Sequence, residues 1–191
     1  MGFMQLQSDI GAWASSNFGD GNPRLALLGL MEESGELCHA VLKATQRIRG
    51  TEQEHMASVR DAVADIFIYL VDFMRRASAG QLFINLNFCN VTSTHFSHST
   101  PWPEAAQKPV SDLYKAIAEL YAYFEPYFFY STIPYGDVNV EVRRHCYLIL
   151  TRLLAVCNTI GFDFSECVET IWSQTVSKRN WKMNPKNGAS L

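Results

Sequence analysis

The chain has no long hydrophobic run, no closely paired cysteines and little excess charge. A membrane helix needs about 18 consecutive apolar residues; Arg152 interrupts the best candidate, Tyr147–Val156, so we expect no span. The five cysteines form no Cys-x-x-Cys pair and the first residues lack a secretory signal, which favours a reducing cytoplasm. The net charge of −3 gives no electrostatic reason to expect binding to a nucleic-acid polymer.

The composition indicates a folded chain with a substantial core. Charged residues make up only 18% of the 191 residues and aromatic residues 13%, which argues against disorder. This length suits one domain of ordinary size. Because apolar residues recur mainly at helical spacing, we expect a single all-α domain over residues 1–191, built as a helical bundle.

Periodicity places the expected elements along the chain. Leu6, Ile10 and Trp13 predict a first helix ending near Phe18, and residues 22–48 and 52–78 predict a helical hairpin with a turn near Gly50. Further helices are expected over about 111–124, 140–159 and 163–176, and the alternating residues of 82–88 predict a short strand or extended segment. On the hairpin we expect a buried side made of Leu27, Leu30, Met31, Cys38, Val41 and Leu42 and of Val63, Phe67, Leu70 and Met74.

Five carboxylates interrupt the apolar hairpin. Glu32, Glu33 and Glu36 lie on its first helix, and Asp61 and Asp65 on its second. Like charges four residues apart cost a helix about 0.2–0.5 kcal/mol per pair, so the arrangement needs a positive partner. A divalent cation such as Mg²⁺ or Mn²⁺ is the simplest, because both take carboxylate oxygens. The alternative is a solvated acidic face.

Antiparallel pairing brings the two groups together. With the turn near Gly50, residues whose numbers sum to about 100 lie opposite one another, so Glu36 lies level with Asp65. Glu32 and Asp61 then fall within about four residues, roughly 6 Å along the helix axis. The hairpin therefore predicts one site that gathers all five carboxylates.

The motif on these residues resembles a known family. Glu32-Glu33-x-x-Glu36 followed by a closing Asp65 is similar to the EExxE and ExxD pattern of the MazG-like, all-α nucleoside triphosphate pyrophosphohydrolases. The flanking Trp13, Phe18 and the segment 176–185 look like those of small phage and bacterial members. The resemblance covers about 3–78 and 150–188, and residues 79–149 look like an insertion. The chain departs from the pattern at Ala62, where the family has Glu; Asp61 lies one residue earlier.

The resemblance implies a metal-dependent hydrolysis of a ribo- or deoxyribonucleoside triphosphate to the monophosphate and pyrophosphate, with a purine deoxynucleotide such as dGTP among the expected substrates. It implies Mg²⁺ or Mn²⁺, more than one ion per site, and a homodimer or homotetramer. The implied metal ligands are Glu33, Glu36, Asp65, Asp61 and Glu32, and Glu32 is also the candidate base. The implied substrate contacts are Lys178, Arg179, Asn180, Lys182 and Trp13.

Several of these residues have plainer interpretations. An aromatic residue at the position of Trp13 is more often part of a core than a platform for a base. Lysines and arginines at the end of a helix often only complement its dipole, which applies to Lys178 and Arg179. Asp72, two turns beyond Asp65, lies on the same stripe, and we expect it to be solvated.

Other functions remain open at this stage. Glu36-x-x-His39 and Glu52-x-x-His55 match the ligand pairs of ferritin-like di-metal bundles, but the pairing places residue 55 about 15 Å from Asp65, so the pairs are not expected to share a site. Zinc at Cys89, His95 and His98 matches no standard spacing. A non-catalytic helical interaction module is the remaining alternative, since the aromatic segment 121–130 could bury a partner surface.

Overall fold

The fold is helical throughout the part of the chain that the structure describes. The computed structural model describes residues 2–77, 101–129 and 137–179, and within these ranges there is no strand, which confirms the all-α expectation. The α-helices are α1 (Phe3–Phe18), α2 (Arg24–Gln46), α3 (Glu52–Ala77), α4 (Gln107–Phe124), α5 (Asp137–Ile160) and α6 (Phe164–Gln174). Short 3₁₀ turns cover Glu104–Ala106, Glu125–Phe129 and Val176–Lys178.

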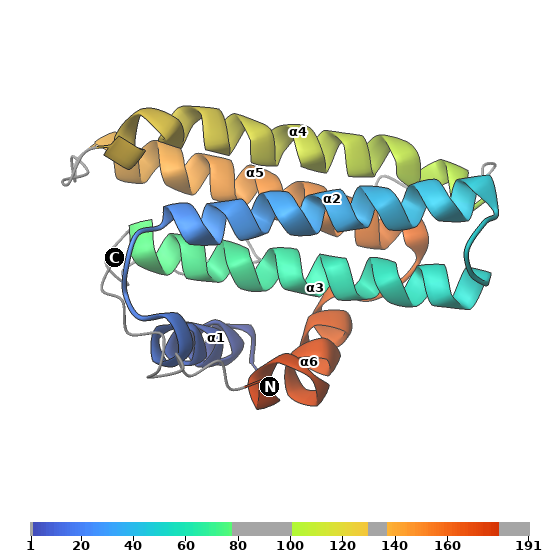
Figure 1. The fold of residues 1–191 in the computed structure, drawn as a ribbon, viewed down its shortest axis with the longest axis horizontal. Helices are drawn as coiled ribbons and strands as arrows, with labels where there is room; N and C mark the ends of the chain where they lie inside the picture. Colours follow the sequence, from blue (N-terminus) through green and yellow to red (C-terminus); the bar gives the residue numbers. More distant parts are fainter. Residues whose placement is uncertain (1, 78–100, 130–136, 180–191) are drawn as a thin grey trace.

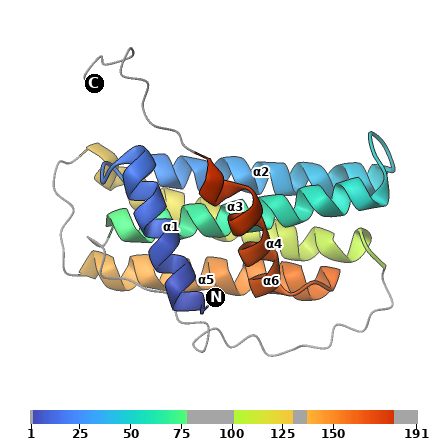
Figure 2. The same cartoon turned by 90° about the horizontal axis from the view of Figure 1, so that it is seen from below.

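The four long helices form a bundle. α2 packs on α3, α4 packs on α5, and the two pairs meet through α2 with α4 and α3 with α5. Figure 1 shows these helices running side by side, with α1 and α6 lying against the outer side of α3. Viewed from below in Figure 2, α1 and α6 cross the bundle rather than follow it. α3 is therefore covered on several sides.

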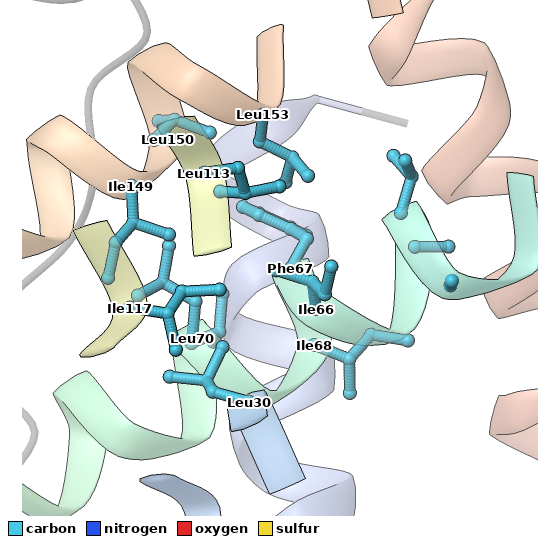
Figure 3. Close-up of a cluster of buried hydrophobic side chains, with 14 of the residues drawn as sticks. Leu30, Ile66, Phe67, Ile68, Leu70, Leu113, Ile117, Ile149, Leu150 and Leu153 are labelled. Carbon is cyan, nitrogen blue, oxygen red and sulfur yellow. The ribbon is translucent and has the colours of Figure 1, made fainter. Parts of the chain in front are cut away.

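One core joins all four long helices (Figure 3). Leu30 of α2, Phe67 of α3, Leu113 of α4 and Ile149 of α5 are all completely buried. Leu113 and Ile149 belong to the stretch 79–149, which the sequence interpretation treated as an insertion. The described part of that stretch supplies α4 and the first half of α5, so it is an integral part of the bundle core.

The hairpin has the expected bounds but a different closure. α2 and α3 begin and end within two residues of the predicted 22–48 and 52–78. The first helix ends before the predicted turn near Gly50, because Arg47 adopts the left-handed conformation (φ 54°) that caps it. Its backbone N–H donates to the carbonyl oxygens of Ala44 and Lys43. Gly50, with φ 147°, shapes the turn that follows.

The later helices differ from the expectation mainly at their starts. α4 begins at Gln107, four residues before the predicted Ser111, and tolerates Pro109 in its first turn, where a missing N–H costs little. Asp163, at the predicted start of the last helix, caps α6: its carboxylate accepts a hydrogen bond of 2.7 Å from the backbone N–H of Glu166. The possible strand over 82–88 lies outside the described residues.

Most of the predicted buried side of the hairpin is buried. Leu42 is the clear error: it is 49% exposed, whereas Leu37, which the prediction omitted, is 1% exposed. Met31 and Cys38 are only half-buried. Hydrophobic character alone had placed Leu42 in the core, but it lies about 100° around the helix from the buried Val41. The predicted residues of α3 are all buried.

No single helix in the described ranges has both the length and the apolar character of a membrane span, although the bent α5–α6 pair reaches that composition when the two are taken together. Several apolar side chains of that pair, such as Leu153 and Val168, are buried in the core, whereas Val140 is exposed.

Candidate active site

Glu33 lies at the centre of the predicted acidic site. Its carboxyl group has a pKa raised to about 8, first by burial and then by the negative charges of Asp65, Glu36, Glu32 and Asp61, in that order. The four other acids therefore lie near enough to Glu33 to disfavour its charge, but the predicted single site is divided, because Glu33 and Asp65 line one cavity and Glu32, Glu36 and Asp61 line another. Glu33 is half-buried, whereas Glu32 and Glu36 are exposed, so a wholly solvated acidic face does not describe this site.

Asp65 shares this environment from the opposite helix. Its carboxyl group has a pKa raised to about 6, because burial, Asp61 and Glu36 raise it by more than the Arg179 guanidinium lowers it. Arg179 is thus the one predicted substrate-binding cation that the structure brings to the acidic site among the residues it describes. It reaches there although 114 residues separate it from Asp65 in the sequence.

The donor set suits a divalent cation, but the ligands are not gathered around one point. In the described part of the chain none of the five carboxylates takes part in an ion pair, and the Arg179 guanidinium offsets their mutual repulsion only in part, at Asp65. Carboxylate oxygens are the ligands that Mg²⁺ and Mn²⁺ prefer. Within the same ranges, no three His, Cys, Asp or Glu side chains already form a metal-holding group.

A cavity of about 290 Å³ adjoins Glu33 and Asp65. Its walls are largely aromatic and aliphatic, and we call it the aromatic cavity; it is lined by Trp13, Ala14, Phe18, Glu33, Asp65, Ile68, Tyr69, Asp72, Val176 and Arg179. Apolar pockets with a few convergent polar groups are typical of small-molecule sites, and this volume is at the small end of their range.

Trp13 belongs both to the core and to this cavity. Its ring packs edge-on against Trp172 and Phe18, with centroid distances of 5.7 and 5.5 Å. Its indole N–H donates to the Arg179 carbonyl oxygen at 3.0 Å. Trp13 therefore ties the segment after α6 to the cavity, which holds Arg179 near Asp65.

Tyr69 and Gly29 form a close contact that the sequence interpretation did not assign to the site. A Cβ added to Gly29 would lie only 2.3 Å from the Tyr69 ring, so the ring lies directly on the backbone of α2. The two numbers sum to 98, close to the predicted pairing value of about 100. A glycine inside a helix was the available signal, since it often marks a close approach. Burial and the acidic cluster, Glu33 foremost, raise the pKa of the Tyr69 hydroxyl.

Asp72 is buried rather than solvated, contrary to the expectation. It is 5% exposed and accepts hydrogen bonds of 2.8 Å from both Arg75 and Arg76. The two arginines lie three and four residues further along α3, which is the spacing at which a helix places side chains together. Asp72 closes one side of the aromatic cavity and is already neutralised by these cations.

Glu32, Glu36 and Asp61 line a second cavity, of about 600 Å³, on the hairpin. Ala62, where the resembling family carries Glu, is 2% exposed and faces the core, so Asp61 is the carboxylate that this turn of α3 offers. His39 and His55 also line this cavity, but Glu52 lies in a separate depression with Thr51, Gln53 and Met56. Three of the four residues of the two Glu-x-x-His pairs thus line one cavity, and Glu52 does not.

Of the remaining predicted substrate residues, the structure describes only Lys178. Lys178 is exposed and lines neither of these cavities. Asn180 and Lys182, like the suggested zinc residues Cys89, His95 and His98, lie outside the described residues.

Comparison with protein-family models, with curated proteins and with solved structures finds no match for this chain. The interpretation of the site therefore depends on its own residues.

Proposed function

We propose that this protein is a metal-dependent nucleoside triphosphate pyrophosphohydrolase, which converts a nucleoside triphosphate and water to the monophosphate and pyrophosphate. The observation that carries the proposal is the half-buried Glu33, whose carboxyl is surrounded by four others and has no cation paired with it in the described ranges. Such a group is costly to ionise without a bound positive charge. The aromatic cavity beside it is suited to a nucleobase.

Mg²⁺ or Mn²⁺ would be held by Glu33, Glu36, Asp65, Asp61 and Glu32, with more than one ion per site. When bound, the ions would neutralise triphosphate charge and lower the pKa of a bound water.

The residues of this chain would then position the substrate. Trp13, Phe18 and Tyr69 would enclose the base in the aromatic cavity, and the Arg179 guanidinium, close to Asp65, would contact an oxygen of the α-phosphate. Arginine suits this task because its planar group donates to two phosphate oxygens at once.

The reaction that follows is an in-line displacement. The water oxygen forms a bond to the α-phosphorus, while the bond from that phosphorus to the oxygen bridging to the β-phosphate breaks, and the electron pair leaves with pyrophosphate. Glu32, exposed and one turn from Glu36, would take the proton that the water loses.

The test is a panel of the common ribo- and deoxyribonucleoside triphosphates with Mg²⁺ or Mn²⁺, scored for monophosphate and pyrophosphate. Glu36→Gln should lower the rate on the best substrate by roughly 100-fold. Losing a metal ligand should reduce activity at least as much as losing a residue that only hydrogen-bonds to a metal ligand. The matched control is Glu119→Gln on the exposed side of α4, which should behave like the wild type. Retained activity in Glu36→Gln would refute the ligand assignment.

Self-association into a homodimer or homotetramer is part of the proposal. Its support is a set of large apolar side chains exposed on α2, namely Leu25 (64%), Leu28 (42%) and Leu42 (49%). The same surface would also serve a non-catalytic interaction module. Light scattering measures the assembly, and the nucleotide panel separates the two functions, because a module that only binds partners releases no pyrophosphate.

A further inference from the structure

The second cavity is lined by both acidic and basic side chains. We call this 600 Å³ cavity the hairpin groove; it is lined by Glu32, Gly35, Glu36, His39, Ala40, Lys43, Arg49, His55, Ser58 and Asp61. On α2 its residues follow one another at single-turn spacing from Glu32 to Lys43, and on α3 from Asp61 back to His55. The groove therefore extends from the acidic site toward the turn of the hairpin.

The two ends of the groove differ in charge. Glu32, Glu36 and Asp61 lie at the end next to Glu33 and Asp65, whereas Lys43 and Arg49 lie at the turn. Seven residues of helix, about 10 Å, separate Glu36 from Lys43. A ligand with a metal-bound phosphate at one end and a free phosphate at the other fits this groove in one orientation. Its metal-bound phosphate lies at the carboxylates and its free phosphate lies at the basic end.

Among the residues that the structure describes, the cations of the basic end form no close ion pair, although carboxylates line the same groove. The nearby Glu54 carboxylate accepts instead from the backbone N–H of Thr51. His55 is 7% exposed, and its Nε2 has no hydrogen-bond partner. Its ring lies under Gly50, where an added Cβ would be 3.2 Å from Cε1. A buried imidazole nitrogen without a partner is costly and points to a polar ligand that the chain itself does not supply.

We propose that the hairpin groove binds the β- and γ-phosphates of the triphosphate, so that pyrophosphate forms and leaves between the carboxylates and the turn. The inference rests on the proposed function and assigns to it a phosphate subsite made of Lys43, Arg49, His39 and His55. The base then occupies the aromatic cavity on the Glu33 and Asp65 side, and the α-phosphate lies at the carboxylates between the two cavities.

Direct binding of inorganic pyrophosphate, with Mg²⁺ present, tests this subsite by calorimetry. The double variant Lys43→Ala/Arg49→Ala removes two cations that are half-buried and exposed, so the fold should persist, which circular dichroism checks. The matched control is Lys115→Ala/Arg144→Ala, which removes one lysine and one arginine from α4 and α5. The conservative variant Lys43→Arg/Arg49→Lys keeps both charges.

We expect the alanine variant to weaken pyrophosphate binding at least tenfold, equivalent to about 1.4 kcal/mol, and to raise the KM for the triphosphate by a similar factor. The control and the conservative variant should bind pyrophosphate like the wild type, and monophosphate binding should not change. Unchanged pyrophosphate binding in the alanine variant, or an equal loss in the control, would overturn the inference.

The result also separates this inference from the proposed function. If the wild type cleaves a triphosphate but the alanine variant binds pyrophosphate as tightly, the groove assignment fails and the hydrolase proposal stands. If no nucleotide is cleaved but pyrophosphate binding depends on Lys43 and Arg49, the subsite stands and the hydrolase proposal fails.

Discussion

Replacing Glu33 with glutamine should change how stability depends on pH. The Glu33 carboxyl has a pKa of about 8 in the folded protein against 4.5 for an ordinary glutamate. Between these values the folded state keeps a proton that the unfolded state has lost, so the stability of the metal-free wild type falls as pH rises through this window. Asp65, raised from 3.8 to about 6, adds to the fall at the lower end.

The magnitude follows from the pKa difference. At 1.36 kcal/mol for each pKa unit, the rise from 4.5 to about 8 sets a ceiling of about 5 kcal/mol on the loss. Glu33 is only half-buried, and solvent screening reduces this to about 1–2 kcal/mol. Glutamine cannot ionise, so Glu33→Gln should unfold roughly 2–8 °C above the wild type at pH 8.5 and show no such gain at pH 4.5.

Thermal unfolding followed by circular dichroism, with a chelator present, measures both curves. Glu119→Gln, an exposed glutamate on α4, provides the control and should keep the pH dependence of the wild type. Adding Mg²⁺ at pH 8.5 should stabilise the wild type more than Glu33→Gln. If the unfolding temperatures of Glu33→Gln and the wild type change with pH in parallel, the other carboxylates do not destabilise an ionised Glu33 and the prediction is refuted.

Three further substitutions and one control test the packing of the site and the core, each by thermal or chemical unfolding. Gly29→Ala should destabilise the protein by about 1–3 kcal/mol, because its Cβ would meet the Tyr69 ring at 2.3 Å. The control Gly35→Ala, whose Cβ would have nothing within 4 Å, should be neutral or stabilise the protein by up to about 1 kcal/mol. Equal effects of the two substitutions would contradict the close approach of Tyr69 to Gly29. Leu113→Ala should cost about 2–5 kcal/mol if α4 is part of the core, and a loss below about 1 kcal/mol would contradict that placement. Asp72→Asn should cost about 3–5 kcal/mol, since it removes the buried counter-charge of Arg76, while Arg75 keeps its pairing with the exposed Asp20; an unchanged midpoint would mean that the ion pairs of Asp72 contribute nothing.

The sequence was most informative where local rules and pairing agreed. Apolar periodicity placed α2 and α3 within two residues of their bounds, and antiparallel pairing then brought Glu33 and Asp65 together. The contact of Gly29 with Tyr69 has nearly the pairing sum that the prediction used. These features depend on helix geometry and one turn, both of which are encoded locally.

Other features depend on which distant segments meet. The burial of Leu113 in α4 could not follow from a resemblance that left residues 79–149 aside. The approach of Arg179 to Asp65 requires the segment after α6 to fold back on Trp13, which no local pattern reveals. Asp72 is a different case: Arg75 and Arg76 one turn ahead were a readable signal that the acid would be paired rather than solvated.

Incubation of the best triphosphate with the protein and Mg²⁺ in ¹⁸O-labelled water, followed by ³¹P NMR, tests the hydrolase proposal most directly. The account predicts pyrophosphate with no label, a monophosphate with one ¹⁸O, and almost no product with Glu36→Gln. Release of orthophosphate, label in pyrophosphate, or no cleavage of any common nucleotide would contradict it.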